Sequence, residues 1–200
     1  MSILTIKDLT IAHVGPINLE LKPGEIVCLS GASGSGKSLM LKAIADIIPA
    51  SGSLSLGDIN SINVLAPIWR KQVALLPAES QWWHDTVGEH FKLANLDLEL
   101  FQQLGFARDC LDWQTSRCST GEKQRLALLR TLANKPKCLL LDEPTGSLDP
   151  DNTLVVEALL KTLATQQQIP ILWVSHSHEQ INRVANRHLV MREGKLVTYE

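Results

Sequence analysis

The chain has 200 residues, a formal net charge of −2 and a hydrophobic fraction of 44%. This length suits one domain, or one domain with a small lobe, and it allows a substantial buried core. Gly 12 and Pro 9 are close to average usage, which excludes collagen-like and disordered chains. A charge near zero lacks the basic excess of general nucleic-acid binders, so we expect no nucleic-acid partner.

No apolar run approaches the roughly 20 residues of a membrane-spanning helix. Lys7 and Asp8 interrupt the region where a secretory signal would remain apolar, so we expect a soluble, intracellular protein. The cysteines have neither C-x-x-C spacing nor a zinc-type pattern with histidine, and we expect reduced thiols. They are Cys28, Cys110, Cys118 and Cys138.

Apolar patterns predict two kinds of strand. Apolar residues alternate with polar ones at 4–6 and 17–21, which is typical of half-exposed antiparallel strands. Residues 25–30, 138–141 and 171–174 are almost uninterrupted apolar runs, typical of parallel strands buried on both faces. We therefore expect a parallel sheet core preceded by an N-terminal antiparallel β subdomain.

Helical patterns separate and follow these strands. They lie at residues 37–47, 122–134, 151–166 and 178–185. Strands that alternate with helices predict an α/β fold, and residues 188–197 predict a closing hairpin. Residues 79–120 carry apolar positions at helical spacing without a strand pattern, so we expect a small helical lobe, approximately residues 79–134, within one domain over residues 1–200.

A glycine-rich segment follows the strand at 25–30 and precedes a helical pattern. It matches G-x-x-x-x-G-K-[ST], the loop whose backbone amides converge on phosphate groups at a helix N-terminus. Lys37 is expected to reach the β- and γ-phosphates, and the Ser38 hydroxyl to bind Mg²⁺. The predicted ATP-binding residues are Gly31, Ala32, Ser33, Gly34, Ser35, Gly36, Lys37 and Ser38.

Two carboxylates end the strand at 138–141. Ligands of open α/β sheets bind at the carboxyl ends of strands, where the phosphate loop also lies. We expect Asp142 to belong to the Mg²⁺ shell and Glu143 to orient and deprotonate the attacking water. Together with the loop, they predict a P-loop NTPase core.

These residues and several further segments resemble the ATP-binding cassette (ABC) ATPase family. Residues 118–125, Cys-Ser-Thr-Gly-Glu-Lys-Gln-Arg, are similar to the family signature LSGGQ-x-Q-R. Cys118, Thr120 and Glu122 replace its Leu, first Gly and Gln, whereas Ser119 and Gly121 match. The motifs occur in the family's order and span nearly the whole chain.

The resemblance implies a composite site. Two cassettes would stack head to tail, with Ser119, Thr120, Gly121 and Glu122 of each contacting the partner's ATP. Ser-x-x-Glu is also a helix capping box, and both roles are compatible.

Two further motifs add site residues. Residues 146–149, Gly-Ser-Leu-Asp, resemble the family's D-loop through Asp149. Residues 174–176, Val-Ser-His, resemble its switch segment, which assigns His176 to the γ-phosphate. The catalytic residues implied are Lys37, Glu143 and His176.

Two positions depart from the family pattern. Ala78 stands where the family has a glutamine that contacts Mg²⁺ and senses the membrane partner, so either Glu79 or Gln81 substitutes for it or the coupling is altered. The aromatic residue that stacks on adenine is missing, which leaves Ile11 or His13 for this contact. We expect modest affinity and weak discrimination between bases.

Two adjacent tryptophans, Trp82 and Trp83, follow shortly after Ala78. One of Trp82 and Trp83 is expected in the core. The other either packs on the lobe or is an exposed contact for a helix of a membrane partner.

The sequence therefore predicts an ATP-hydrolysing subunit of an ABC transporter, with ATP and Mg²⁺ as ligands. The resemblance implies a homodimer in the ATP-bound state and a separate integral-membrane permease, with the chain at the cytoplasmic face of the membrane. Small bacterial export-type cassettes, such as iron-export ATP-binding subunits, resemble it most. The alternative is a soluble ABC ATPase of the DNA-repair or translation type; a GTPase is disfavoured because the guanine motif N-K-x-D is absent.

Overall fold

Six strands form the central sheet, in the order β10-β9-β3-β8-β7-β6. The structure is a computed structural model that describes residues 2–91 and 96–198. The strands are β3 (Ile26–Ser30), β6 (Val73–Leu76), β7 (Cys138–Asp142), β8 (Ile171–Val174), β9 (Arg187–Arg192) and β10 (Lys195–Thr198). Neighbouring strands are parallel, except that β10 pairs antiparallel with β9.

The uninterrupted apolar runs form the interior of this sheet, as predicted. Every residue of β7 and β8 is buried, because helices and the second sheet cover both faces. The predicted hairpin is formed by β9 and β10. The predicted α/β fold with its parallel core is confirmed.

A second, antiparallel sheet has the order β2-β1-β4-β5. Its strands are β1 (Leu4–Ile11), β2 (Val14–Leu21), β4 (Ser51–Leu56) and β5 (Ile59–Asn60). The alternation in β1 and β2 turns one face of each strand into the core, which confirms the predicted antiparallel subdomain. β4 and β5 were not predicted from the sequence.

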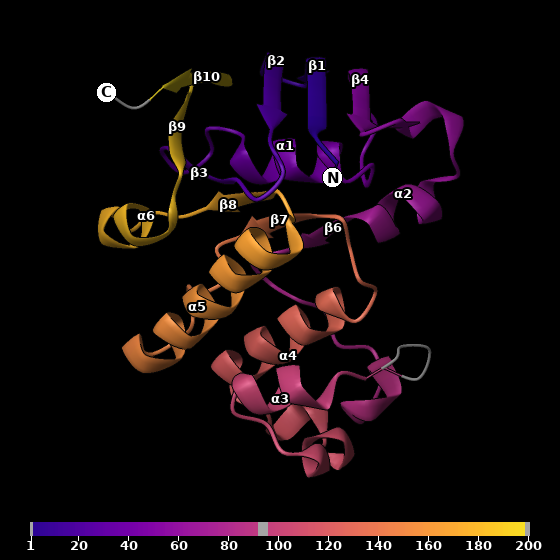
Figure 1. Ribbon diagram of the computed structural model, residues 1–200, viewed down its shortest axis with the longest axis vertical. Helices are drawn as coiled ribbons and strands as arrows, with labels where there is room; N and C mark the ends of the chain where they lie inside the picture. Colours follow the sequence, from indigo (N-terminus) through magenta and orange to yellow (C-terminus); the bar gives the residue numbers. More distant parts are fainter. Residues whose placement is uncertain (1, 92–95, 199–200) are drawn as a thin grey trace.

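Helix α1 (Lys37–Ile44) lies between the two sheets (Figure 1). Met40, Leu41 and Ile44 are fully buried there, in a cluster with residues of both sheets. The short helix α2 (Ala66–Gln72) joins this cluster through Trp69, whose indole Nε1 donates to Ile44 O at 2.8 Å. The end of α1 is thus fixed by a helix that the sequence did not predict.

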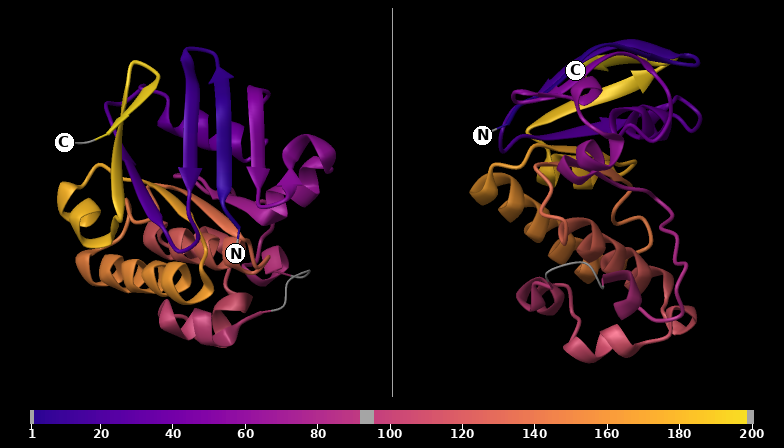
Figure 2. Two further views of the ribbon diagram at one scale, coloured as in Figure 1. Left: turned by 45° about the horizontal axis from the view of Figure 1, so that its top comes forward. Right: turned by 90° about the vertical axis from the view of Figure 1, so that its right-hand side faces the viewer.

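The opposite face of the six-stranded sheet carries α4 (Thr120–Leu132) and α5 (Pro150–Gln167). Figure 2 shows these two helices below the sheet, with α3 (Leu98–Gln103) farther out and α6 (His178–Val184) at the edge near β9. Three 3₁₀ turns accompany α3, at Gly88–Phe91, Arg108–Asp112 and Thr115–Arg117.

The region predicted as a lobe is built mainly from short helices around a few buried side chains. Phe91, Phe101 and Leu104 are buried in one cluster, as helical spacing suggested, while Leu96 is exposed. Leu93, part of the same pattern, lies outside the described residues. Helices of this length gain little stability on their own, so the packing of these apolar residues on α4 stabilises them.

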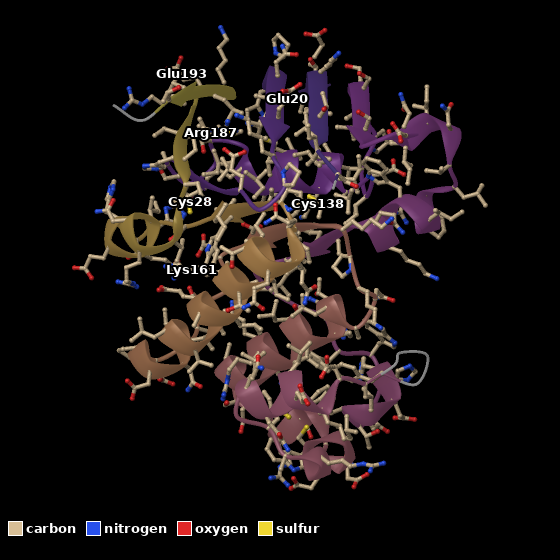
Figure 3. All side chains as sticks on the ribbon, viewed as in Figure 1. Glu20, Cys28, Cys138, Lys161, Arg187 and Glu193 are labelled. Carbon is tan, nitrogen blue, oxygen red and sulfur yellow. The ribbon has the colours of Figure 1, made fainter. Side chains whose placement is uncertain are left out.

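Figure 3 labels side chains of both sheets, among them Glu20, Arg187, Cys28 and Cys138. Arg187 on β9 donates through Nη2 to Glu20 O on β2 at 2.7 Å and pairs with Glu25 Oε1 at 3.3 Å. All four cysteines are buried and free. Burial, with a smaller contribution from Glu157, raises the pKa of Cys28 to about 12, so this thiol stays protonated. Within the described ranges, no helix combines the length and apolar character needed to cross a bilayer.

Candidate functional site

The carboxyl ends of β3, β8 and β7 lie side by side and bring the predicted motifs together. Asp142 pairs in register with Val174, and the Glu143 backbone NH donates to Val174 O at 3.1 Å. On the other side of β8, the Ser175 NH donates to Leu29 O at 3.2 Å. The phosphate loop, the two carboxylates and the His176 segment therefore share one edge of the sheet.

The phosphate loop is closely surrounded by backbone and side chains of two strands, β2 and β9. Gly36, at the N-cap of α1, has φ 106, and an added Cβ would lie 2.2 Å from Val14 Cγ2. A Cβ at Gly31, with φ 145, would lie 2.4 Å from Met191 O. Glycine is required at both positions, and the loop is therefore positioned by the first residue of β2 and by β9.

Lys37 lies inside the loop. Its Nζ donates to Gly31 O at 2.8 Å and to Ala32 O at 2.9 Å. Burial lowers the pKa of Lys37, whereas the nearby Glu143 and Asp142 carboxylates raise it, and the net direction is downward. The ammonium group is thus held between the phosphate loop and the carboxylates, as phosphate binding requires.

The donor groups of this edge fit a phosphate chain and a magnesium ion. The Ser35 hydroxyl is buried and has no hydrogen-bond partner among the residues described, so an anion oxygen would satisfy it. Ser38 is exposed and Asp142 is buried at the end of β7. Oxygen donors of this kind suit Mg²⁺, which takes one or two protein ligands and completes its shell with phosphate and water.

Glu143 and His176 are in direct contact. His176 Nε2 lies 3.1 Å from Glu143 Oε1, and the side chains are 50% and 41% exposed, so a ligand can reach both. Glu143 adopts φ 50, a left-handed conformation that costs about 1 kcal/mol or more for a residue other than glycine. Gln124 Nε2 donates to Glu143 O at 2.7 Å and supports this backbone geometry.

The signature-like segment forms the N-terminus of α4. Glu122 NH donates to Ser119 Oγ at 3.2 Å, and Ser119 NH donates to Glu122 Oε2 at 2.7 Å, which completes a capping box. The Ser119 hydroxyl also donates to Glu122 Oε2 at 2.9 Å. Hydrogen bonding from the Ser119 backbone NH is the main cause that lowers the pKa of Glu122. The exposed Ser119 and Thr120 leave this helix N-terminus accessible from outside.

The D-loop-like segment leads from β7 to α5 and contacts the signature helix on its way. Ser147 NH donates to Gln124 Oε1 at 3.0 Å, so the two segments are in contact. Asp149 caps α5: its Oδ1 accepts from Asn152 NH at 2.9 Å, and its Oδ2 accepts from Asn152 Nδ2 at 2.6 Å. The Asn152 backbone hydrogen bond is the main cause that lowers the pKa of Asp149.

The residues considered as substitutes for missing family residues differ in accessibility. Ala78, Glu79 and Gln81 all follow β6 in exposed positions. Ile11 is buried in the core, whereas His13 is exposed at the β1–β2 turn beside the phosphate loop. Of the two candidates for the adenine contact, His13 is the one whose side chain is open to a ligand.

The two tryptophans divide as expected. Trp82 packs against the core, and Trp83 is 63% exposed. The Arg130 guanidinium lies over both indoles, 4.6 Å and 4.8 Å from their centroids, and the His90 ring meets both edge to face. We call Trp82, Trp83, His90 and Arg130 the aromatic cluster; sequence reasoning missed its His90 and Arg130, which carry no motif.

A groove of about 380 Å³ runs beside this cluster. It lies between the sheet and the end of α4. Its lining includes Ile47, Arg70, Ser80, Trp83, His90, Arg130 and Asn134. The exposed indole at its wall makes the groove suitable for an apolar side chain of another molecule.

Taken together, the fold, the phosphate loop and the carboxylate–histidine pair define a P-loop ATPase of the cassette type. The chain belongs to the ABC transporter family, whose model, described as "ABC transporter", matches residues 14–146. It is accordingly an ATP-binding ATPase domain and the ATP-binding subunit of a membrane transporter.

Particular relatives support this assignment. The energy-coupling factor transporter ATP-binding protein EcfA2 of Staphylococcus aureus (strain USA300) is 31% identical over 203 residues, which cover 91% of this chain and 70% of that protein. A dimeric post-hydrolysis structure of the ATP-binding cassette MJ0796 bound to ADP and Pi has a TM-score of 0.84 at 22% identity, covering 98% of this chain and 99% of that one. An ATP-bound bacterial Atm1-family ABC exporter gives 0.83 at 20% identity, covering 98% of this chain and 38% of that one. The two structures confirm the fold.

Proposed function

We propose that two copies of this chain close around ATP and Mg²⁺ and thereby drive a separate membrane permease. The observation that carries the proposal is the contact of 3.1 Å between Glu143 and His176 at the strand edge that also holds the phosphate loop. A proton acceptor and a polar contact for the γ-phosphate are thus placed beside a loop suited to the phosphate chain.

Each site residue has a distinct task in this proposal. Lys37 and the backbone amides of residues 31–38 bind the β- and γ-phosphates, and Ser38 and Asp142 hold Mg²⁺, which neutralises phosphate charge when bound. Glu143 accepts the proton of the attacking water, and His176 contacts the γ-phosphate and orients the Glu143 carboxylate.

The second copy completes the site. The exposed N-terminus of α4 contacts the γ-phosphate of the ATP bound by the partner. The residues of this contact are Ser119, Thr120, Gly121 and Glu122. Asp149 lies in the segment that contacts α4 and is assigned to the same interface. Residues 1–200 then act as one domain in which residues 79–134 form the lobe that carries the signature. A two-fold pair of this kind forms two equivalent sites.

The permease is proposed to contact the groove beside the aromatic cluster. Trp83 is the exposed anchor, and the loop of Ala78, Glu79 and Gln81 lies directly before it in sequence. This loop is therefore proposed to link the permease contact to the nucleotide site, with Glu79 or Gln81 in place of the missing glutamine. Because the permease spans the membrane, contact with it would place this chain at the inner face of the membrane as a peripheral protein.

The test uses Glu143→Gln. The amide cannot accept the proton of the attacking water, so hydrolysis should fall at least about a hundredfold while ATP binding is retained. Because bound ATP then persists, the variant should run as a dimer in light scattering with ATP and Mg²⁺ and as a monomer without ATP.

Lys37→Ala is the control for nucleotide binding. It should lose ATP affinity and show no ATP-dependent dimer. Hydrolysis by Glu143→Gln at the wild-type rate would refute the assigned base, and a monomer at saturating ATP and Mg²⁺ would refute the closed pair.

A further inference from the structure

A buried glutamine on α6 links two loops of the site. Gln180 is 5% exposed and uses every hydrogen-bonding group of its amide. Oε1 accepts from Ser175 Oγ at 2.8 Å, and Nε2 donates to Thr145 Oγ1 at 2.8 Å and to Glu157 Oε1 at 2.9 Å. The segment after β7, the segment after β8 and helix α5 are therefore all bound to this one amide.

On one side, Gln180 fixes the backbone around His176. Ser175 Oγ, which donates to the glutamine, also accepts from Ser177 NH at 3.1 Å. Ser177 Oγ in turn accepts from Gln180 NH at 3.2 Å and caps α6. The residues immediately before and after His176 are thus both bound to Gln180.

On the other side, Gln180 fixes the turn that follows Glu143. Thr145, the acceptor of its amide, lies two residues after Glu143, and Gly146 NH closes the turn by donating to Glu143 O at 3.1 Å. Glu143 is the first residue after β7, and this turn determines the direction of the chain there. A shift of Thr145 would therefore displace the Glu143 carboxylate relative to His176.

An ion pair determines how the amide is oriented. Glu157 on α5 is 4% exposed and accepts from Arg183 Nε at 2.9 Å and Nη2 at 2.7 Å. Burial raises the pKa of Glu157, but hydrogen bonds from Arg183 and Gln180 outweigh it, so the net direction is downward. An ionised carboxylate only accepts, so Nε2 of Gln180 must face it and Oε1 must face Ser175. Lys161 on α5 adds a bond to Arg183 O at 3.0 Å and joins α5 to α6 (Figure 3).

We propose that Gln180 is a positioning residue for ATP hydrolysis, which holds the Glu143 turn and the His176 loop at the separation that their 3.1 Å contact requires. The inference rests on the proposed roles of Glu143 and His176. Gln180 acts without contacting nucleotide, because its buried amide oxygen and both amide hydrogens bind protein groups. Misplacing a reacting group by about 1 Å costs on the order of a hundredfold in rate, so this restraint affects kcat.

The first test compares Gln180→Glu with Gln166→Glu, the same change at an exposed glutamine of α5. Gln180→Glu should lower kcat roughly tenfold or more at pH 8 and change the KM for ATP less than about threefold, because the phosphate loop is not involved. Gln166→Glu should behave as the wild type in both respects. A rise in KM without a fall in kcat would overturn the inference.

The pH profile distinguishes positioning from general damage. In Gln180→Glu, two carboxylates would face each other and share a proton, which raises the pKa of the pair. The protonated form restores one donor toward Glu157, so kcat should recover between pH 8 and pH 6 relative to Gln166→Glu. A ratio that does not change with pH would count against the proposal.

Thr145→Val provides a test if Gln180→Glu fails to fold. It removes one hydrogen bond of the network and keeps a similar side-chain shape, so kcat should fall with KM unchanged; a wild-type kcat would overturn the inference. Glu143→Gln distinguishes a failure of the positioning role of Gln180 from a failure of the proposed function. If it is inactive while the Gln180 and Thr145 variants are fully active, the positioning role fails alone; if it hydrolyses ATP normally, the proposed function fails.

Discussion

The His90 side chain fixes the backbone of the segment that begins at Trp83 and ends at His90 itself. Its Nε2 accepts from the backbone NH groups of Trp83 and His84 at 3.0 Å and 3.2 Å. Its Nδ1 lies 3.0 Å from Thr86 O, which fixes the tautomer with hydrogen on Nδ1. The neutral ring therefore holds Trp83 at the groove, and a proton on Nε2 would oppose both backbone donors.

The pH dependence of stability follows from this arrangement. Burial is the main cause that lowers the pKa of His90; hydrogen bonding to Thr86 opposes it, and Arg130 and His84 lower the pKa further. The unfolded chain takes up the proton near pH 6.5, before the folded chain does, so stability is full above this pH and is lost as pH falls toward the folded pKa. The urea midpoint should therefore be lower at pH 5.5 than at pH 7.5.

His90→Gln is the matched variant, since its amide oxygen can accept from the Trp83 NH but does not titrate. The midpoint difference between the two pH values should shrink in this variant. Part of it should remain, because burial and His178 also lower the pKa of His188. An identical pH dependence in the two proteins would show that His90 is not the group responsible.

At the scale of elements, the N-terminus of α4 combines two tasks that conflict. Glu122 stabilises the helix through the capping box, and its carboxylate binds the Ser119 hydroxyl that is proposed to meet the partner's ATP. The carboxylate also brings a negative charge near the place where a phosphate would bind.

Glu122→Gln should therefore tighten the ATP-dependent dimer. Glutamine also completes a capping box, so the melting temperature should change little. Removing one exposed repulsion worth ~1 kcal/mol corresponds to roughly fivefold in the dimer dissociation constant. Equilibrium sedimentation in the hydrolysis-deficient Glu143→Gln background measures this, and weaker dimerisation would contradict the argument.

How far the sequence predicts an element depends on how local its signal is. The strands β3, β7 and β8 have uninterrupted apolar runs, and the phosphate loop has glycines whose conformations the local turn requires. β4 reads Ser-Gly-Ser-Leu-Ser-Leu, and only its two leucines are buried, so pairing with β1 rather than local preference makes it a strand. The Gln180 network has no sequence signal because its members meet only when four separate segments have folded.

In the molecule as a whole, the nucleotide edge and the groove are lined by different residues. Contact with a permease can therefore be removed without touching the hydrolysis machinery. Trp83 is the exposed anchor for this test.

Trp83→Ala should release the chain from membranes. Truncation of a central tryptophan at an interface typically costs 2 kcal/mol or more, about thirtyfold in affinity. In cells that express the native transporter, the sedimenting fraction should fall, while basal ATPase activity of the purified variant is unchanged. Val197→Ala, at an exposed position of β10, is the control and should sediment as the wild type. Equal sedimentation of both variants would place the permease contact elsewhere.

The pairing of β3 also sets the order in which the protein can mature during synthesis. β3 lies between β8 and β9, whose residues 171–192 are made long after the phosphate loop has left the ribosome. Until then its apolar strand has no neighbour, and Gly31 lacks the backbone of Met191 against which the loop rests. A nascent chain therefore lacks both neighbours of this apolar strand until β8 and β9 have been made, and we expect the loop to bind nucleotide only after β9 has emerged.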